Sequence, residues 1–363
     1  LAGMLREPPM IGAIDTDAAA LAKTTVATRL QIGESHTRGF GAGGDVHLAR
    51  LAANDDAEMI AGLVADFKLV VVVTSLGGGT GTAVTPVLLK AAREQGAAAL
   101  CFATLPFQFE GRDRHVTADR AMMVLREAAD GLIVVPNDRL FANGATGTMD
   151  QAFREANRVF ASGLGGVWRL LTQPGYINLT LSDLLHLFRQ TDGVCSLGFA
   201  EATGPGRAEA LVSQLMKSPL TDTGRSLAHA RSALVSIAGG SDLTLQEVGD
   251  IMARLAEVMP GDCFLSMGTM IDEAFQNRIA VPVVPSEYVT VPVGPSPKEG
   301  LLPAEPDEQE KPRRKGTKKD DAQPSLGLET SGKGRFKGVE PTVLDGEDLD
   351  TPTFIRRGIA IDR

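Results

Sequence analysis

The sequence predicts an α/β protein in which a parallel-sheet domain is joined by a long central helix to a smaller α+β domain, followed by a disordered tail. Up to Leu140, short apolar stretches alternate with amphipathic ones, which is typical of a parallel sheet with helices on both faces. A long amphipathic run begins near Thr148, and the composition changes to Pro, Glu, Lys, Asp and Gly from about Pro295. The predicted parallel-sheet domain comprises residues 1–147, the central helix 148–173 and the α+β domain 174–290. The tail is divided into a linker, 291–345, and a C-terminal peptide, 346–363.

Four apolar runs are the predicted strands of the first domain: 10–14, 70–74, 98–104 and 132–135. The second of them is a run of four valines followed by Thr74. We interpret it as a buried strand, because β-branched residues without polar alternation are typical of strands covered on both faces.

The central helix is predicted to begin at Thr148, because Thr148 and Gln151 have the spacing of a capping box. Pro174 is expected to end it. A second region follows, with strands near 193–200, 232–238, 263–267 and 279–284, and Thr244 and Glu247 are expected to cap a helix between two of them. The tail from Pro295 onward has too few large apolar residues to offset its chain entropy, so we expect a disordered linker.

The bulk composition excludes several classes of protein. With 363 residues, 43% of them hydrophobic, the chain can bury a sizeable core. A net charge of −9 argues against a general nucleic-acid binder. The apolar runs are far shorter than the roughly 18 residues of a membrane span. The five histidines and three cysteines show no metal-ligand spacing, so we expect no metal site and reduced, buried thiols.

A glycine-rich hexamer follows the valine strand and precedes an apolar run that can form a helix. It consists of Gly77, Gly78, Gly79, Thr80, Gly81 and Thr82. Glycines let consecutive backbone N–H groups converge on an anion, and a helix N-terminus adds its positive dipole end. The hexamer therefore predicts a phosphate site, with a plain flexible loop as the alternative. It has neither the lysine of a Walker loop nor the dinucleotide-binding glycine spacing, which argues against a nicotinamide-dependent oxidoreductase.

In its position between strand and helix, this hexamer resembles the signature loop of the tubulin/FtsZ family of GTPases. Further segments, 30–33, 37–43, 106–112 and 136–140, are similar to the bacterial FtsZ branch and occur in its order. The resemblance covers nearly the whole chain. It implies a cytoplasmic division protein that binds GTP or GDP with Mg²⁺ carried on the nucleotide. It further implies that the protein polymerises head to tail with copies of itself into a ring at the division site.

The resemblance also implies a role for each matching residue of the nucleotide site. The hexamer would hold the β- and γ-phosphates, and the small residues Gly41, Ala42 and Gly43 would sense the γ-phosphate. Other matches are Glu110 and Arg114 at the ribose and phosphates, Asn137 at guanine, and Phe153 and Asn157 at the base. For Glu110 and Arg114, solvated charges on a helix face are the alternative. Asn157 departs from the aspartate that is usual in FtsZ, yet we expect GTP to outcompete ATP by an order of magnitude or more.

A second departure lies in segment 175–183, which matches the loop that enters the nucleotide site of the adjacent subunit in a filament. FtsZ carries an asparagine and two aspartates there, whereas this chain has Asn178, Thr180 and Asp183. Thr180 can orient a water but cannot accept its proton. Because a positioned acid or base contributes about 10²- to 10⁴-fold, we expect slow hydrolysis that Thr180→Asp would raise. The alternative is a non-hydrolysing, nucleotide-binding paralogue with a structural or regulatory role in filaments.

Apolar residues return at the end of the chain. Segment 348–357 resembles the peptide by which FtsZ docks onto membrane tethers and regulatory division proteins, with a frayed terminus as the plain alternative. A proline with aromatic and aliphatic anchors suits a motif that orders on binding. The residues concerned are Leu349, Pro352, Phe354, Ile355 and Arg356.

The first recognisable segment, 10–17, resembles the family's second strand and the acidic loop after it. The family's first strand and first glycine-rich loop have no counterpart before this segment, so we expect the sequence to be a piece of a longer protein. A sheet without that strand would have unpaired edges in its middle.

Overall fold

The computed structural model describes residues 9–141, 148–173, 175–189 and 194–286, together with strands β11 (Val343–Leu344) and β12 (Glu347–Asp348). These two strands pair antiparallel within the unit Pro295–Arg363, and the other described residues belong to the unit Leu1–Gly294. Several sequence predictions lie outside the described residues: Pro174, most of the predicted linker, and the peptide residues Leu349, Pro352, Phe354, Ile355 and Arg356.

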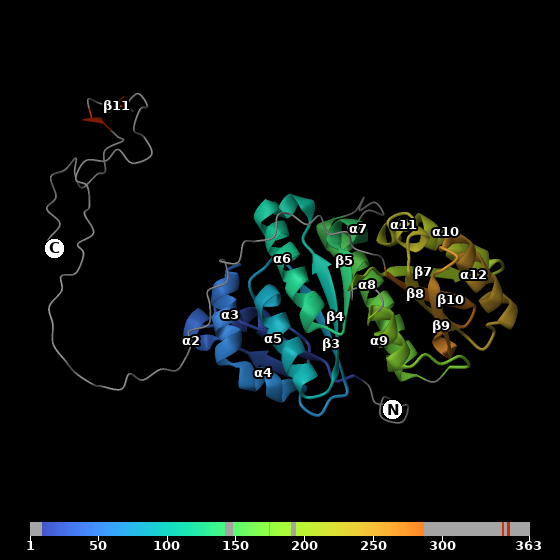
Figure 1. Ribbon diagram of the computed structural model, residues 1–363, viewed down its shortest axis with the longest axis horizontal. Helices are drawn as coiled ribbons and strands as arrows, with labels where there is room; N and C mark the ends of the chain where they lie inside the picture. The colour runs from blue at the N-terminus through green and yellow to red at the C-terminus, as the bar shows by residue number, and fades with distance from the viewer. Residues whose placement is uncertain are drawn as a thin grey trace, which may run out of the picture. The chain divides into compact units, whose positions relative to one another are not determined.

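The first half of the chain alternates strands and helices, as the sequence predicts (Figure 1). Its elements are β1 (Gly12–Asp15), α1 (Ala18–Ala22), β2 (Thr28–Gln31), α2 (Glu34–Thr37), α3 (Val46–Asp55), α4 (Ala57–Val64), β3 (Leu69–Ser75), α5 (Thr80–Glu94), β4 (Ala98–Leu105), α6 (Arg112–Ala128), β5 (Gly131–Pro136) and α7 (Asn137–Phe141). A short 3₁₀ turn, Gln108–Glu110, precedes α6.

The strands of this half are parallel but form two separate ladders. β3, β4 and β5 pair in sequence order, while β1 pairs with β2. Among the described strands, β3 has no partner besides β4, and β1 has none besides β2. Among the four valines, the interpretation as buried holds only for Val72, because Val70 and Val71 are half-buried and Val73 is 55% exposed. The prediction of unpaired edges agrees with this arrangement.

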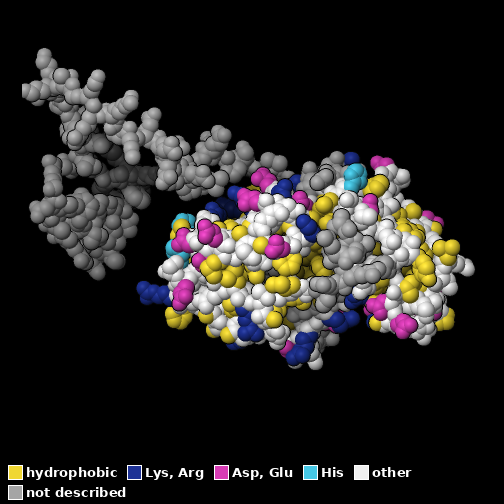
Figure 2. Space-filling view, turned by 90° about the horizontal axis from the view of Figure 1, so that it is seen from below, with side chains coloured by type: hydrophobic (Ala, Val, Ile, Leu, Met, Phe, Trp, Pro, Cys, Tyr) yellow, Lys and Arg dark blue, Asp and Glu magenta, His cyan; other side chains and the backbone are white. Residues whose placement is uncertain are grey.

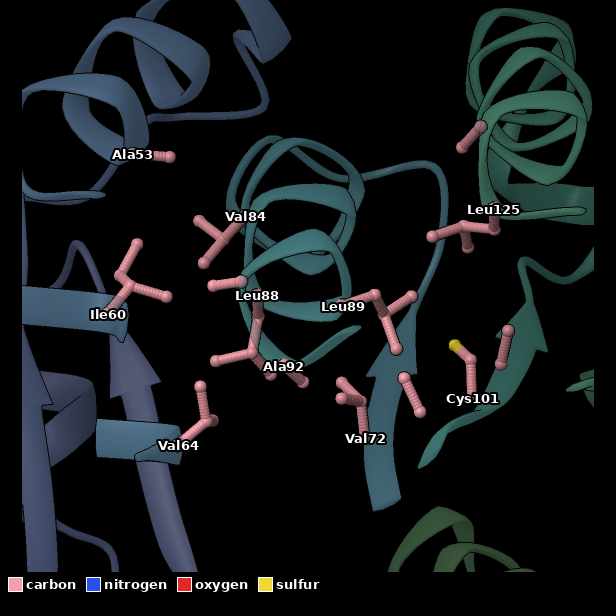
Figure 3. Close-up of a cluster of buried hydrophobic side chains, with 14 of the residues drawn as sticks. Ala53, Ile60, Val64, Val72, Val84, Leu88, Leu89, Ala92, Cys101 and Leu125 are labelled. Carbon is pink, nitrogen blue, oxygen red and sulfur yellow. The ribbon is translucent and has the colours of Figure 1, made fainter. Parts of the chain in front are cut away.

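Helix α5 occupies the middle of the first hydrophobic core. Figure 3 shows Val84 and Leu88 turned toward the side chains of α3 and α4, and Leu89 turned toward Leu125 of α6 and Cys101 of β4. Leu89 is fully buried. The helix that follows the glycine hexamer is thus packed on several sides, and this packing fixes the position of its N-terminus.

The central helix α8 (Met149–Thr172) has the predicted capping box. The Thr148 side chain accepts from the backbone N–H of Gln151 at 3.3 Å, and the Gln151 side chain accepts from the N–H of Thr148 at 3.0 Å. Figure 1 shows α8 between β5 and the strands of the second half. The helix approaches these strands closely through small residues, because a Cβ on Gly166 would overlap the ring of Pro282.

The second half contains α9 (Leu181–Arg189), β6 (Val194–Cys195), β7 (Gly198–Thr203), α10 (Arg207–Lys217), α11 (Arg225–Ala228), β8 (Ser232–Gly239), α12 (Leu245–Val258), β9 (Phe264–Ile271) and β10 (Arg278–Ser286). Helix α12 has the predicted capping box of Thr244 and Glu247. Strand β10 lies antiparallel between β7 and β8, and β8 is parallel to β9. The mixed sheet agrees with the α+β class expected here.

A short strand that the sequence analysis did not separate connects the two halves. The predicted strand 193–200 is divided into β6 and β7 in the described residues. β6 pairs parallel with β5 and meets β10 antiparallel at the pair Cys195 and Ser286. The strands from β3 to β10 therefore belong to one continuous eight-stranded sheet.

Candidate functional site

The glycine hexamer lies where the sequence places it, between the end of β3 and the beginning of α5 at Thr80. Gly77 has a φ of +92°, which favours glycine, and a Cβ on Gly81 would lie 2.5 Å from the carbonyl oxygen of Ser75. Gly79 precedes α5 without a side-chain capping bond. The first N–H groups of a helix have no intrahelical partner, so this turn can accept an anion.

A second glycine loop, Gly41 to Gly44, packs against the hexamer. Three of its glycines have positive φ, including Gly41 at +78°. A Cβ on Gly79 would lie 2.9 Å from the Cβ of Ala42 and 3.0 Å from the carbonyl oxygen of Asp45. The structure therefore brings together the two loops that the sequence assigns to the phosphates.

Hydrogen bonds that involve threonine hydroxyl groups connect the hexamer to Thr16 and connect two residues within the hexamer. The Oγ1 atoms of Thr16 and Thr80 lie 2.7 Å apart, and Thr82 Oγ1 accepts from the backbone N–H of Gly77 at 3.1 Å. Thr16 is not among the site residues expected from the sequence, although segment 10–17 contains it. The available signal was the short polar residue between Asp15 and Asp17 at the end of a parallel strand.

Glu110 and Arg114 lie next to the hexamer as an ion pair one helical turn apart. Glu110 Oε2 accepts from Arg114, and Glu110 Oε1 accepts from the N–H of Phe107 at 2.9 Å. A Cβ on Gly77 would lie 2.9 Å from the carbonyl oxygen of Arg114. The Arg114 side chain is 56% exposed, so it remains accessible to a ligand.

The residues expected at the base gather around four phenylalanines at the N-terminal end of α8. The Phe153 ring is T-shaped against Phe107, with centroids 6.0 Å apart, and against Phe141 at 4.9 Å. Phe107 also stacks on Phe109. Of this group, only Phe153 is among the site residues expected from the sequence. The signal for two of the others was the segment 106–112, which contains both Phe107 and Phe109.

The two asparagines lie near this aromatic group. Asn137 is the first residue of α7. The neighbouring Asp138 accepts from the N–H of Gln108 at 3.2 Å, which ties α7 to the segment before α6. Asn157 is exposed on α8, one helical turn after Phe153. The arrangement offers aromatic faces and amide groups to a base.

The segment that contains Asn178 is anchored on β9. Asn178 Oδ1 accepts from the N–H of Gly175 at 2.7 Å. The N–H of Ile177 donates to Thr269 Oγ1 at 3.0 Å, and the N–H of Thr269 donates to the Ile177 carbonyl at 2.9 Å. A Cβ on Gly175 would overlap the Thr269 carbonyl oxygen. The loop is therefore held against the sheet by one backbone–backbone bond and by one bond from the Ile177 N–H to the Thr269 hydroxyl.

Thr180 and Asp183 form a reciprocal capping arrangement at the start of α9. One carboxylate oxygen of Asp183, Oδ2, accepts from the N–H of Thr180 at 2.8 Å and from its hydroxyl at 2.7 Å. The N–H of Asp183 in turn donates to Thr180 Oγ1 at 3.2 Å. The backbone and hydroxyl bonds from Thr180 hold the pKa of the Asp183 carboxyl below its ordinary value.

The two groups of site residues lie at opposite ends of α8. Phe153 is in the second turn of the helix, whereas the Asn178 loop follows its C-terminal end. At 1.5 Å per residue, the 24 residues of α8 span about 36 Å. Within one chain, the Asp183 carboxylate cannot reach the aromatic group around Phe153.

Other kinds of site find no support among the described residues. No group of three or more His, Cys, Asp or Glu side chains could hold a metal ion there, and no described helix is long and apolar enough to cross a membrane.

Burial raises the pKa of the Cys101 thiol to about 12. On the face shown in Figure 2, Lys and Arg side chains are interspersed with Asp and Glu.

Comparisons with known proteins agree with this geometry. Residues 7–144 match the tubulin/FtsZ family, GTPase domain, and residues 193–288 match the FtsZ family, C-terminal domain. Cell division protein FtsZ 1 of Archaeoglobus fulgidus is 35% identical over 272 residues, which are 75% of this chain and 73% of the relative. Cell division protein FtsZ of Bartonella bacilliformis is 38% identical over 272 residues, covering 74% of this chain and 45% of the relative.

Solved structures give the same result. An FtsZ variant from M. jannaschii superposes with a TM-score of 0.70 at 32% identity, over 76% of this chain and 82% of that one. CetZ2 from Haloferax volcanii shares the fold, with a TM-score of 0.62 at 24% identity over 77% of this chain and 85% of that one. The chain belongs to the tubulin/FtsZ family, and its first half contains that family's GTPase domain.

Proposed function

We propose that this chain is a GTPase that assembles head to tail with copies of itself and hydrolyses GTP where two copies meet. One observation carries the proposal: the aromatic group around Phe153 and the Asp183 loop lie at opposite ends of α8, whose 24 residues span about 36 Å. A head-to-tail contact would bring the nucleotide-binding residues of one copy next to the Asp183 loop of another. We call these two sets of residues the nucleotide half-site and the catalytic half-site. An FtsZ from M. jannaschii, 32% identical to this chain, has been solved as a dimer, which supports self-association.

In the proposed nucleotide half-site, the backbone N–H groups of the hexamer hold the β- and γ-phosphates, and the loop beginning at Gly41 contacts the γ-phosphate. Glu110 and Arg114 contact the ribose and phosphates. Asn137, Phe153 and Asn157 bind guanine. Mg²⁺ carried with the nucleotide supplies charge neutralisation of the phosphates.

In the proposed catalytic half-site, Asn178 and Asp183 position the attacking water for the neighbouring copy. Water attack on a phosphate depends mainly on positioning and charge stabilisation. With Thr180 where the resemblance to FtsZ implies an acid, a single carboxylate is available, so hydrolysis is slow. Thr180→Asp adds the second carboxylate and loses the hydroxyl bond to Asp183. Because a positioned acid or base contributes about 10²- to 10⁴-fold, we expect the gain to exceed this loss and phosphate release per polymerised subunit to rise. Release no higher than in Thr180→Val, which has neither the hydroxyl nor the acid, would show that the missing acid does not limit the rate.

The proposed cellular setting is a cytoplasmic ring at the division site. There the C-terminal residues Leu349, Pro352, Phe354, Ile355 and Arg356 would bind membrane-tethering and regulatory division proteins. The apolar residues of this peptide, in an otherwise polar tail, support this binding role. A direct test is the binding of a peptide spanning 346–363 to such a tether, compared with the same peptide carrying Phe354→Ala.

Two variants with complementary defects test the shared site. Asp183→Ala removes the carboxylate but leaves the nucleotide half-site intact. Gly78→Asp places a negative charge in the phosphate loop, at a position where an added Cβ meets nothing within 4 Å. We expect neither variant alone to release phosphate from GTP, whereas a mixture does, because one interface then combines two intact half-sites. Gly78→Asn is the uncharged control.

The outcome separates this proposal from its alternative. Sedimentation with GTP together with phosphate release supports a polymerising GTPase. Polymer without phosphate release, in the wild type and in the mixture, would favour the non-hydrolysing structural or regulatory paralogue.

A further inference from the structure

Thr180 is bonded directly to the carboxylate on which the proposed hydrolysis depends. Its backbone N–H and its hydroxyl both donate to Asp183 Oδ2, at 2.8 and 2.7 Å. The second carboxylate oxygen, Oδ1, lies outside this capping arrangement. An aspartate at position 180 has no proton to donate at neutral pH, so it could not make the hydroxyl bond. The substitution found in this chain therefore creates a contact that two acids could not form.

The residues that flank this pair are anchored by burial and by hydrogen bonds. Leu179 and Leu184, on either side of the exposed Thr180 and Asp183, are buried in the hydrophobic core beside α8. The preceding loop is bonded to Thr269 of β9 through both backbone groups of Ile177. With its flanks fixed, the remaining freedom of the carboxylate is rotation of the Asp183 side chain. The two bonds from Thr180 restrict this rotation.

We propose that Thr180 is a positioning residue whose hydroxyl holds the Asp183 carboxylate in a fixed orientation for use in the nucleotide site of a second copy of the chain. The inference rests on the proposed function, since it concerns the same shared site. In this proposal Thr180 does not replace the absent acid. Its hydroxyl fixes the orientation of the one carboxylate that remains, that of Asp183. The hydroxyl itself takes no part in proton transfer.

The test compares two substitutions of Thr180 in the full chain. Thr180→Ser keeps the hydroxyl, while Thr180→Val keeps the branched shape and loses it. We expect phosphate release per sedimented subunit to fall about tenfold or more in Thr180→Val, to stay within about twofold in Thr180→Ser, and polymer mass to be the same in both. Equal release by the wild type and Thr180→Val would overturn the proposal.

The chain offers a matched control in α12. Thr244 and Glu247 form the same reciprocal arrangement, with Thr244 Oγ1 2.9 Å from Glu247 Oε2 and the Glu247 N–H donating back at 3.2 Å. Thr244→Val therefore removes an equivalent helix cap from an element outside the proposed site. We expect it to leave phosphate release unchanged. If it lowers release as much as Thr180→Val, then the effect is general loss of a cap, and the proposal fails.

A second measurement does not depend on turnover. In protein labelled at the aspartate carboxyl carbon, an NMR titration follows the ionisation of Asp183 in the unassembled chain. We expect the pKa of Asp183 to be higher in Thr180→Val than in the wild type and Thr180→Ser. His186, the other group that lowers this pKa, is present in every variant. Identical pKa values of Asp183 in the three proteins would overturn the positioning role. If the pKa differs as expected but the wild type never releases phosphate, then only the proposed function is contradicted.

Discussion

The hydroxyl oxygens of Thr16 and Thr80 lie 2.7 Å apart, although 64 residues separate them in the chain. Thr16 is fully buried after β1, and its carbonyl oxygen accepts from the Thr37 hydroxyl at 3.2 Å. Thr80 is the first residue of α5. Since β1 shares no ladder with β3 among the described strands, this contact links the β1–β2 segment to the helix that follows the glycine hexamer.

The Thr16 contact predicts a change in nucleotide affinity. Thr16→Val removes the hydroxyl without changing the branched shape, and Thr16→Ser keeps it. A typical hydrogen bond is worth about 0.5–1.5 kcal/mol, so we expect Thr16→Val to weaken GTP binding by about 2- to 10-fold and Thr16→Ser to bind normally. Titration with a fluorescent GTP analogue measures this. Equal affinity of all three proteins would show that the contact is not coupled to the nucleotide.

Asn157 predicts a second effect on binding. An amide offers one acceptor oxygen, whereas an aspartate offers two to the N1–H and N2–H groups of guanine. We therefore expect Asn157→Asp to strengthen GTP binding by about tenfold, because hydrogen bonds to charged groups are stronger, and Asn157→Ala to weaken it. Competition between GTP and ATP checks the assignment. If ATP displaces a bound guanine nucleotide as effectively as GTP does, then the assignment of Asn157 to the base site is wrong.

Two glycines of α8 predict opposite changes in stability. A Cβ on Gly166 would overlap Pro282 of β10, whereas a Cβ on Gly165 meets only the Arg169 side chain, at 3.7 Å. Overpacking costs about 1–3 kcal/mol, and an alanine favours a helix over a glycine by about 1 kcal/mol. We expect Gly166→Ala to lower the free energy of unfolding and Gly165→Ala to raise it, as measured by denaturant titration.

The buried ion pairs of Arg207 predict a dependence of stability on pH. Arg207 is 6% exposed and bonds to Glu247 at 2.7 Å and to Asp242. The hydrogen bond from Arg207 is the main cause that lowers the pKa of Glu247 from 4.5 to about 2. Because the folded pKa is the lower one, this stabilisation is complete above about pH 4.5 and is lost as the pH falls toward about 2.

Glu247→Gln isolates that contribution. The glutamine does not titrate, so the difference in Tm between the wild type and this variant should be largest near neutral pH and should shrink below about pH 4.5. Thermal unfolding followed by circular dichroism at several pH values measures it. A difference that stays constant with pH would show that the Arg207 pair does not set the ionisation of Glu247.

Much of the fold could be predicted because its signals are local. The capping boxes of Thr148 and Thr244 and the strands β1, β3, β4 and β5 follow from residues a few positions apart, and the structure contains them. Strand β2 has no counterpart among the predicted strands. The exposure of Val73 could not be predicted, because it depends on which strands pair with β3. The division of segment 193–200 likewise depends on β6 meeting both β5 and β10.

For the site, the sequence alone determined the glycine hexamer and its place between strand and helix, since these are matters of residue type and spacing, whereas the departures at Asn157 and Thr180 are defined by the resemblance to FtsZ. Only the tertiary structure decided that Thr16 meets Thr80 and that the Phe153 group and the Asp183 loop lie at opposite ends of α8, whereas the bond between Thr180 and Asp183 has the local spacing of a capping box. These relationships depend on side-chain direction and on the length and packing of a helix. Hydrogen bonds act over about 3 Å, and such distances between residues far apart in the chain are set by the fold.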